Sequence, residues 1–274
     1  MSSPESKKEM NLKNAIDESS FYNLFPNCFD IETLPSTHKQ DWYTAKKTLS
    51  SGFIKPMPCS VFEGENLAYY FYGKAPYAIA QHMGMRGDKM YYPVCYVLDT
   101  SKIKMSHVFA FDTGAFAKGF FDDFLHKKMS IGSFAIEPKI PQLKGFVKEF
   151  FEDNDNYYRS IPKCIAEKYT DNDEVMAYVN MICNKGQVQF DVRCATLEII
   201  SESELQLEKS LKAIILAKEQ AHSNENIMKL KEKGIEIITY NTFGGDPGSY
   251  NAIIQDLLYT YLLDNKLCVE KVTI

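Results

Sequence analysis

The amino-acid sequence predicts a mixed α+β protein. Segments rich in aromatic and β-branched residues, which favour strands, alternate with segments whose apolar residues recur every three or four positions, which favours helices. Hydrophobic residues make up 45% of the 274 residues, enough to bury one large core. We therefore expect a single domain over residues 21–274, preceded by a mobile polar arm over residues 1–20 and carrying a helical insertion over residues 141–186.

Charge and cysteine content argue against several classes of protein. The formal net charge is −5 and no long block of like charges occurs, so a broad nucleic-acid-wrapping surface is not indicated, although a local basic groove stays open. The seven cysteines include no C-x-x-C pair, which favours reduced thiols in a cytoplasmic protein over disulfides or a zinc site. The first twenty residues lack the apolar segment of a secretory signal, and no apolar run nears the ~18 residues that span a bilayer.

The first third of the chain alternates between helix and strand. Residues 40–52 predict a helix, because Trp42, Ala45 and Leu49 share one face and Gly52 suits its end. The aromatic run NLAYYFY predicts a strand. The remaining strands expected before residue 140 cover 91–99 and 103–111, and the helical segments cover 76–83 and 116–128.

The rest of the chain returns from helices to strands. Apolar spacing predicts mostly helical structure over residues 141–184. The segments expected after it are strands at 188–192, 194–200, 211–216 and 235–240, and helices at 221–233 and 249–263.

A strand of tyrosines is the first candidate for a binding site. Alternation places Tyr70 and Tyr72 on one face, where two flat rings with hydroxyl groups would suit stacking on a planar heterocycle. Tyr77 follows one short turn later and could offer a second plane. The alternative is an amphipathic strand at a surface or an interface.

Two titratable residues are further candidates. His38 precedes the first helix, although a lone histidine is usually structural or exposed. Glu198 lies amid apolar residues of an expected strand, where a carboxylate costs several kcal/mol unless it is paired or hydrated. The alternative places Glu198 in solvent on an edge strand.

Two other patterns carry less chemistry. The loop FGGDPGS, residues 243–249, could cradle a phosphate, but it matches no nucleotide-binding motif and reads more simply as a loop with Ser249 capping the last helix. The remaining histidines form no H-E-x-x-H pattern, so we expect no metal site.

Taken in order, these segments resemble a known family. The sequence presents STHKQDWYTAKKTLSSGFIKP, then LAYYFYGKAPYAI, then PVCYVLD and FDTGAF, and last VRCATLEII. This order is similar to that of ADP-ribosyltransferases of the His–Tyr–Glu kind, and most similar to the DarT-type toxins that modify DNA. The resemblance spans roughly residues 31–240. Lys39 departs from it, because a small residue often follows the family's histidine.

The resemblance implies a fold, a co-substrate and roles for particular residues. The fold would have split antiparallel β-sheets with flanking helices, and NAD would donate ADP-ribose. Glu198 would stabilise the cation-like ribose, and His38 would donate a hydrogen bond to a ribose hydroxyl. The tyrosines would hold the nicotinamide, while Lys74 or Arg86 would take the place of a site arginine.

The resemblance also implies partners. The acceptor would be a macromolecule, either a nucleic acid base or a protein side chain, in a toxin or antiviral-defence effector that an antitoxin could neutralise. Two other functions stay open from the residues alone. One is a non-catalytic binding module with a tyrosine-rich interaction strand. The other is a metal-dependent nuclease using the carboxylates of FDTGAF and DNDEVMAY.

Overall fold

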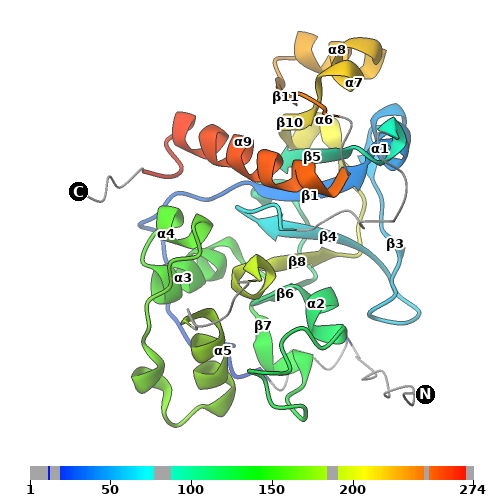
Figure 1. Cartoon of the computed structure of the whole chain (residues 1–274). Coiled ribbons are helices and arrows are strands. Elements are labelled where there is room, and N and C mark those ends of the chain that lie inside the picture. The colour runs from blue at the N-terminus through cyan, green and yellow to red at the C-terminus, as the bar shows by residue number, and fades with distance from the viewer. Residues whose placement is uncertain (1–11, 13–18, 77–87, 184–190, 244–246, 270–274) are drawn as a thin grey trace.

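A mainly antiparallel sheet with helices on both sides forms the body of the molecule (Figure 1). The computed structural model describes residues 12, 19–76, 88–183, 191–243 and 247–269. The order of strands along the sheet is β11-β10-β5-β1-β4-β8-β6-β7, β3 pairs with β4, and β2 and β9 form a separate pair. The strands are β1 (Ser36–Asp41), β2 (Phe53–Ile54), β3 (Met57–Pro58), β4 (Asn66–Tyr72), β5 (Pro93–Leu98), β6 (His107–Phe109), β7 (Ala135–Ile136), β8 (Glu198–Ser201), β9 (Leu205–Gln206), β10 (Leu211–Ala217) and β11 (Glu236–Tyr240).

The helices gather in separate groups around this sheet. In Figure 1, α9 crosses the upper strands of the sheet. Helices α3, α4 and α5 lie together below the C-terminal end of α9. The α-helices are α1 (Trp42–Ser51), α2 (Thr113–Ala117), α3 (Ile140–Phe151), α4 (Asn154–Tyr158), α5 (Asp173–Cys183), α6 (Leu207–Ser210), α7 (Lys218–Ser223), α8 (Glu225–Glu232) and α9 (Tyr250–Asp264). The short 3₁₀ helices are η2 (Lys89–Tyr91), η3 (Thr100–Lys102), η4 (Ile131–Phe134), η5 (Ala166–Tyr169), η6 (Val192–Ala195) and η7 (Pro247–Ser249).

The mixed α+β class is therefore confirmed, and several elements follow the sequence closely. Helix α1 begins where the Asp41 carboxylate accepts a hydrogen bond from the Thr44 N–H, and it ends at Gly52 in the left-handed conformation. Strand β4 covers the whole tyrosine-rich run as expected.

Other predicted elements are shorter or divided. Of the helix expected over 116–128, only the first two residues are helical, and they form the end of α2. The chain leaves the helix there because Gly119 adopts the left-handed conformation, with φ of 73°. The helix expected over 221–233 is interrupted at Asn224, whose side chain caps α8. The strand expected at 188–192 lies mostly outside the described residues, and Val192 begins a 3₁₀ helix instead.

The helical stretch after residue 140 belongs to the same core as the sheet. Tyr178 of α5 packs edge-on against Phe21 and Phe150, with ring centroids 5.4 Å apart in both pairs. Buried apolar residues of this stretch join those of the sheet in one connected cluster. The helical stretch expected as an insertion within the single domain therefore packs into the same core as the sheet.

The expected N-terminal arm is only partly described. Leu12 is buried in the core, and the Ser20 N–H donates a hydrogen bond of 3.0 Å to the Ser133 carbonyl oxygen. The described residues of the expected arm therefore contact the body of the molecule. Among the residues that the structure describes, no helix has the length and apolarity needed to cross a membrane.

The turn after β4 supplies a test of the packing. Gly73 has φ of 67°, and a Cβ built there would lie 2.5 Å from Leu34 Cδ1, whereas Gly64 has φ of 86° with nothing within 4 Å. We expect Gly64→Ala to cost about 1–2 kcal/mol for the left-handed backbone. We expect Gly73→Ala to cost about 1–3 kcal/mol more because of the overlap with Leu34. Denaturant unfolding of both variants measures the difference, and equal losses would contradict it.

Candidate functional site

Three strands from distant parts of the sequence lie next to one another at the centre of the sheet. Strand β4 lies between β1 and β8, so His38, the tyrosine run and Glu198 occupy consecutive strands. The register pairs Thr37 with Phe71, and Phe71 with Glu198. The structure thus brings the predicted segments together.

The same register separates the predicted side chains between two faces. Directly paired residues point to the same side of a sheet, so Glu198 shares a face with Phe71 and Thr37. His38 is one residue beyond Thr37 and lies on the opposite face, beside Tyr70. The predicted side chains that the structure describes therefore do not share a single surface.

Glu198 is almost completely buried and lacks an ionic partner within the described chain. Its side chain is 2% exposed, and its Oε1 accepts a hydrogen bond of 2.6 Å from the Thr113 hydroxyl and one of 3.3 Å from the Thr113 N–H. Burial raises the pKa of Glu198 well above its ordinary value, and the nearby negative charge of Asp112 raises it further. The alternative of an exposed edge strand is wrong, because β6 pairs with the outer side of β8.

His38 is held at the place where β1 and β4 part. The strands pair only through Ser36 and Thr37, after which the His38 ring bonds Tyr69, its Nδ1 donating to the Tyr69 carbonyl oxygen at 2.8 Å. Burial lowers the pKa of His38, so the ring is neutral and its Nε2 carries a lone pair. That nitrogen is buried and has no hydrogen-bond partner among the described residues.

The two tyrosines predicted to stack on a heterocycle lie in the core. Tyr70 and Tyr72 are both 0% exposed, and the Tyr72 hydroxyl accepts a hydrogen bond of 3.0 Å from the Leu34 N–H. Neither ring leaves a face open to a ligand, so the expected platform is not formed by these residues. Tyr77 lies outside the described residues.

Tyr69, and not the predicted Tyr70 or Tyr72, is the tyrosine of β4 that lies on the same face as Glu198. It is half-buried on the Glu198 face, and its hydroxyl lies 2.7 Å from Cys59 Sγ. Burial raises the pKa of Tyr69, and the charge of Glu198 contributes to that rise, which places the two groups near each other. Alternation alone did not single out Tyr69, because its exposure depends on what covers each face.

Lys74 is buried and is not an open cationic ligand. Its side chain is 3% exposed, and Nζ donates hydrogen bonds to the Ala195 carbonyl oxygen at 2.6 Å and to Ser160 Oγ at 2.9 Å. The role of a site arginine expected for Lys74 is therefore not supported by its placement, and Arg86 lies outside the described residues.

Sequence reasoning missed the partners that surround the Glu198 carboxyl. Thr113 and Asp112 belong to FDTGAF, which sequence reasoning considered only as part of the family resemblance and as a source of carboxylates for a nuclease. Asp112 caps α2 through a hydrogen bond of 2.6 Å from the Ala115 N–H. The sequence did contain a signal for these partners, which is the Asp112–Thr113 pair at the start of a short helix. Such residues cap the first turn of a helix, and their side chains can also hydrogen-bond a neighbouring group.

Within the described residues, the loop FGGDPGS and the search for metal ligands add no side chain to the site. Three residues of that loop lie outside the described chain, and Ser249 forms no side-chain cap on α9, unlike the expected arrangement. Across the described ranges, no group of three His, Cys, Asp or Glu residues could hold a metal ion.

Comparisons with protein-family models, curated proteins and solved structures found no match to this chain.

The buried carboxyl makes a stability prediction with a definite sign. Because the folded-state pKa of Glu198 is raised, the folded protein binds this proton more tightly than the unfolded chain. Its contribution to stability is present below the ordinary pKa of 4.5 and is lost as pH rises toward the folded-state pKa. At about pH 7 we expect Glu198→Gln to have a higher melting temperature than the wild type. Its free energy of unfolding should be greater by about 1.4 kcal/mol for each tenfold difference in proton affinity between the folded and unfolded states. Near pH 4 we expect the two proteins to be equally stable.

Thermal denaturation across this pH range measures the effect. Glu202→Gln is the matched control, because Glu202 is exposed just past the end of β8. Equal melting temperatures of wild type and Glu198→Gln at neutral pH would contradict the prediction.

Proposed function

We propose that the protein is an ADP-ribosyltransferase that transfers ADP-ribose from NAD to a macromolecular acceptor. The observation that carries the proposal is Glu198, a buried carboxyl without an ionic partner in the described chain, on the strand next to the tyrosine run. A buried carboxyl of raised pKa beside polar groups is a common feature of catalytic sites. His38, on the other neighbour of β4, adds a neutral imidazole with a free nitrogen.

The limited pairing of β1 with β4 supports the split sheet of the proposed fold. The Tyr69 carbonyl oxygen accepts the hydrogen bond from His38. As a backbone group of a strand, it points toward the neighbouring strand in the plane of the sheet and not out of either face. The imidazole therefore lies where β1 and β4 part, whereas Glu198 lies on the far side of β4 and on the opposite face, so the proposal requires the dinucleotide to reach both places.

Glu198 would act on charge that develops during the reaction. The bond between ribose C1′ and nicotinamide breaks, nicotinamide leaves with the bonding electrons, and an acceptor atom then bonds to C1′ and releases its proton. An ionised carboxylate beside the ribose stabilises the intermediate positive charge. The raised pKa of Glu198 means that this ionised form increases as pH rises.

His38 would position the sugar as a hydrogen-bond acceptor. Because Nδ1 donates to the Tyr69 carbonyl and the ring is neutral, Nε2 can only accept. A ribose hydroxyl would therefore donate to His38, which reverses the direction expected from the sequence. Tyr69, on the Glu198 face, is the ring best placed to contact the leaving nicotinamide.

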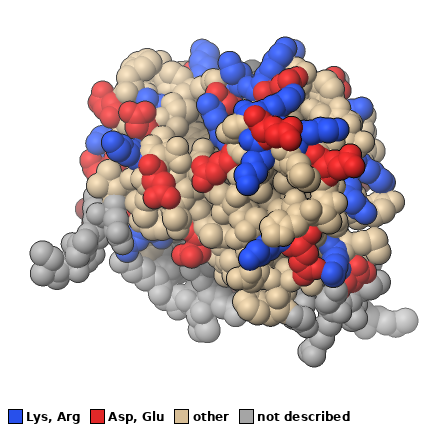
Figure 2. All heavy atoms as spheres, turned by 90° about the horizontal axis from the view of Figure 1, so that it is seen from above, with Lys and Arg blue, Asp and Glu red and all other residues tan. Residues whose placement is uncertain are grey.

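The acceptor would be a nucleic acid base or a protein side chain, in a toxin or antiviral-defence effector of the cytoplasm. Figure 2 shows lysine and arginine interspersed with acidic residues over one face, so that face offers no single-sign surface for nucleic acid. Mass spectrometry of nucleic acid and protein after reaction with NAD identifies the acceptor, and an antitoxin would be sought among proteins that block the transfer.

The first test of the activity replaces the carboxyl. We expect Glu198→Gln to lower transfer of label from NAD by about 10²-fold or more while the protein stays folded, because the lost charge acts mainly in the transition state. Glu202→Gln should retain full activity. If the wild type releases no nicotinamide and forms no labelled product, a binding module is favoured. If it cleaves nucleic acid with a metal ion and without NAD, a nuclease is favoured.

The second test concerns the imidazole. His38→Ala should weaken NAD binding by about tenfold, because one hydrogen bond to a ribose hydroxyl is worth about 0.5–1.5 kcal/mol. His222→Ala is the control, because His222 is exposed on α7. Titration calorimetry measures both variants, and identical NAD affinity in wild type and His38→Ala would remove His38 from the site.

A further inference from the structure

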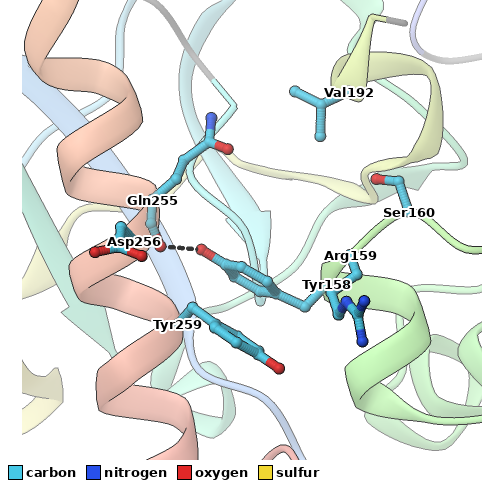
Figure 3. A pocket seen from close by; sticks show the side chains of 7 residues that line it. All are labelled: Tyr158, Arg159, Ser160, Val192, Gln255, Asp256 and Tyr259. Carbon is cyan, nitrogen blue, oxygen red and sulfur yellow. Dashed lines mark hydrogen bonds between the residues drawn. The ribbon is translucent and has the colours of Figure 1, made fainter. Parts of the chain in front are cut away.

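A second site lies apart from the Glu198 carboxyl, in a pocket between α4 and α9. The pocket has a volume of about 410 Å³. Figure 3 shows the Ser160 hydroxyl directed into it, with Arg159 from the same end of α4. The lining residues are Tyr158, Arg159, Ser160, Val192, Gln255, Asp256 and Tyr259.

Ser160 connects this pocket to the buried amine of Lys74. Its Oγ lies 2.9 Å from Lys74 Nζ, and its side chain is half-buried. Its backbone is fixed just past α4, where the Ser160 N–H donates to the Tyr157 carbonyl and the Ile161 N–H donates to the Asn156 carbonyl. Ser160 has φ of 54°, a left-handed conformation uncommon for a residue with a side chain. The hydroxyl is therefore held between an open pocket and a buried amine.

The surroundings of Lys74 suit a base. Nζ also donates to the Ala195 carbonyl oxygen at 2.6 Å and lies 4.5 Å from the centroid of the Tyr157 ring. No carboxylate pairs with it in the described part of the chain. Burial lowers the pKa of Lys74 to about 7, so the neutral amine is well populated near neutral pH. A neutral amine can donate to Ala195 and still accept the Ser160 proton on its lone pair.

We propose that Ser160 and Lys74 form a serine–lysine dyad that hydrolyses a small ester bound in the pocket between α4 and α9. The Ser160 hydroxyl is the nucleophile and Lys74 is the general base, a combination known to replace the histidine of other serine hydrolases. The activity is independent of the proposed use of NAD.

The steps of the reaction balance. Ser160 Oγ forms a bond to the ester carbonyl carbon while its proton passes to Lys74 Nζ. The alcohol then leaves when its C–O bond breaks, taking that proton from Lys74. Water hydrolyses the acyl-serine in the same way, with Lys74 accepting and returning one proton, so no other reactant is needed.

Several groups line the pocket around Ser160. Arg159 is one of them, and Figure 3 shows its side chain directed away from Ser160; that side chain is 40% exposed and has one contact of 3.5 Å to Asp155. The Val192 N–H, at the start of η6, donates no hydrogen bond to another described residue. The stacked rings of Tyr158 and Tyr259, 5.0 Å apart, form an apolar wall that suits an aryl or short acyl group.

The test uses a biotin-tagged alkyl fluorophosphonate on the full chain without NAD. This probe forms a P–O bond to an activated serine and loses fluoride. We expect mass spectrometry to find the label on Ser160, and we expect Ser160→Ala to abolish it. Hydrolysis of p-nitrophenyl acetate should fall by about 10²-fold or more in the same variant.

A second pocket of the same molecule supplies the matched control. Ser50 lines a pocket of about 520 Å³ together with Lys46 and Lys47, which are on the surface of α1 and not buried. Ser50→Ala should leave labelling and hydrolysis unchanged. Both measurements are made without NAD, which separates this activity from the proposed ADP-ribosyl transfer.

The pH dependence tests the role of the amine without a destabilising variant. Because the neutral form of Lys74 is the base, the labelling rate of the wild type should rise with pH through about 7 and then level off. Label on serines other than Ser160, equal labelling of Ser160→Ala, or a rate that rises without levelling would overturn the proposal.

Discussion

The position of Glu198 depends on one hydroxyl group from a helix. Tyr157 of α4 donates a hydrogen bond of 2.9 Å to the Tyr72 carbonyl oxygen and accepts one of 3.0 Å from the Leu197 N–H. These backbone groups belong to the end of β4 and the residue just before β8. Because an unpaired backbone group in the core costs about 1–3 kcal/mol, this bridge ties α4 to the sheet. The helical stretch after residue 140 is therefore required for the geometry of the central strands.

Three buried titratable groups surround these central strands, and each is accommodated differently. Lys74 is enclosed by a carbonyl oxygen, a hydroxyl and an aromatic ring. Lys39 donates a hydrogen bond of 2.8 Å to Asn251 of α9, and burial lowers its pKa to about 8. Among the described residues, only Thr113 donates hydrogen bonds to Glu198, and burial raises the pKa of this carboxyl. Buried charges without counter-ions lower stability, so their presence points to a role beyond folding.

The tyrosine run shows how one strand serves two purposes. Tyr70 and Tyr72 face the core, where Tyr72 accepts from Leu34. Tyr69 faces the side of Glu198 and contacts Cys59 through its hydroxyl. The alternation of side chains along β4 thus separates the fully buried Tyr70 and Tyr72 from Tyr69, which is partly exposed.

The sequence alone determined the class of fold and most of its elements. Aromatic and β-branched runs marked β4, β5 and β10, and helical spacing with a glycine stop marked α1. These signals are local, because backbone geometry repeats along one segment. The sequence also identified Glu198 as a carboxyl in an apolar strand, because the contrast between a charged residue and its apolar neighbours is visible within a few positions.

Only the tertiary structure decided which side chains meet. The register between β1, β4 and β8 placed His38 and Glu198 on opposite faces, and a shift of one residue would have reversed this. The partners Thr113, Ser160 and Tyr157 come from segments that no local pattern links to these strands. Contacts between residues far apart in sequence depend on how the whole core packs, and a single sequence does not encode that in any local spacing.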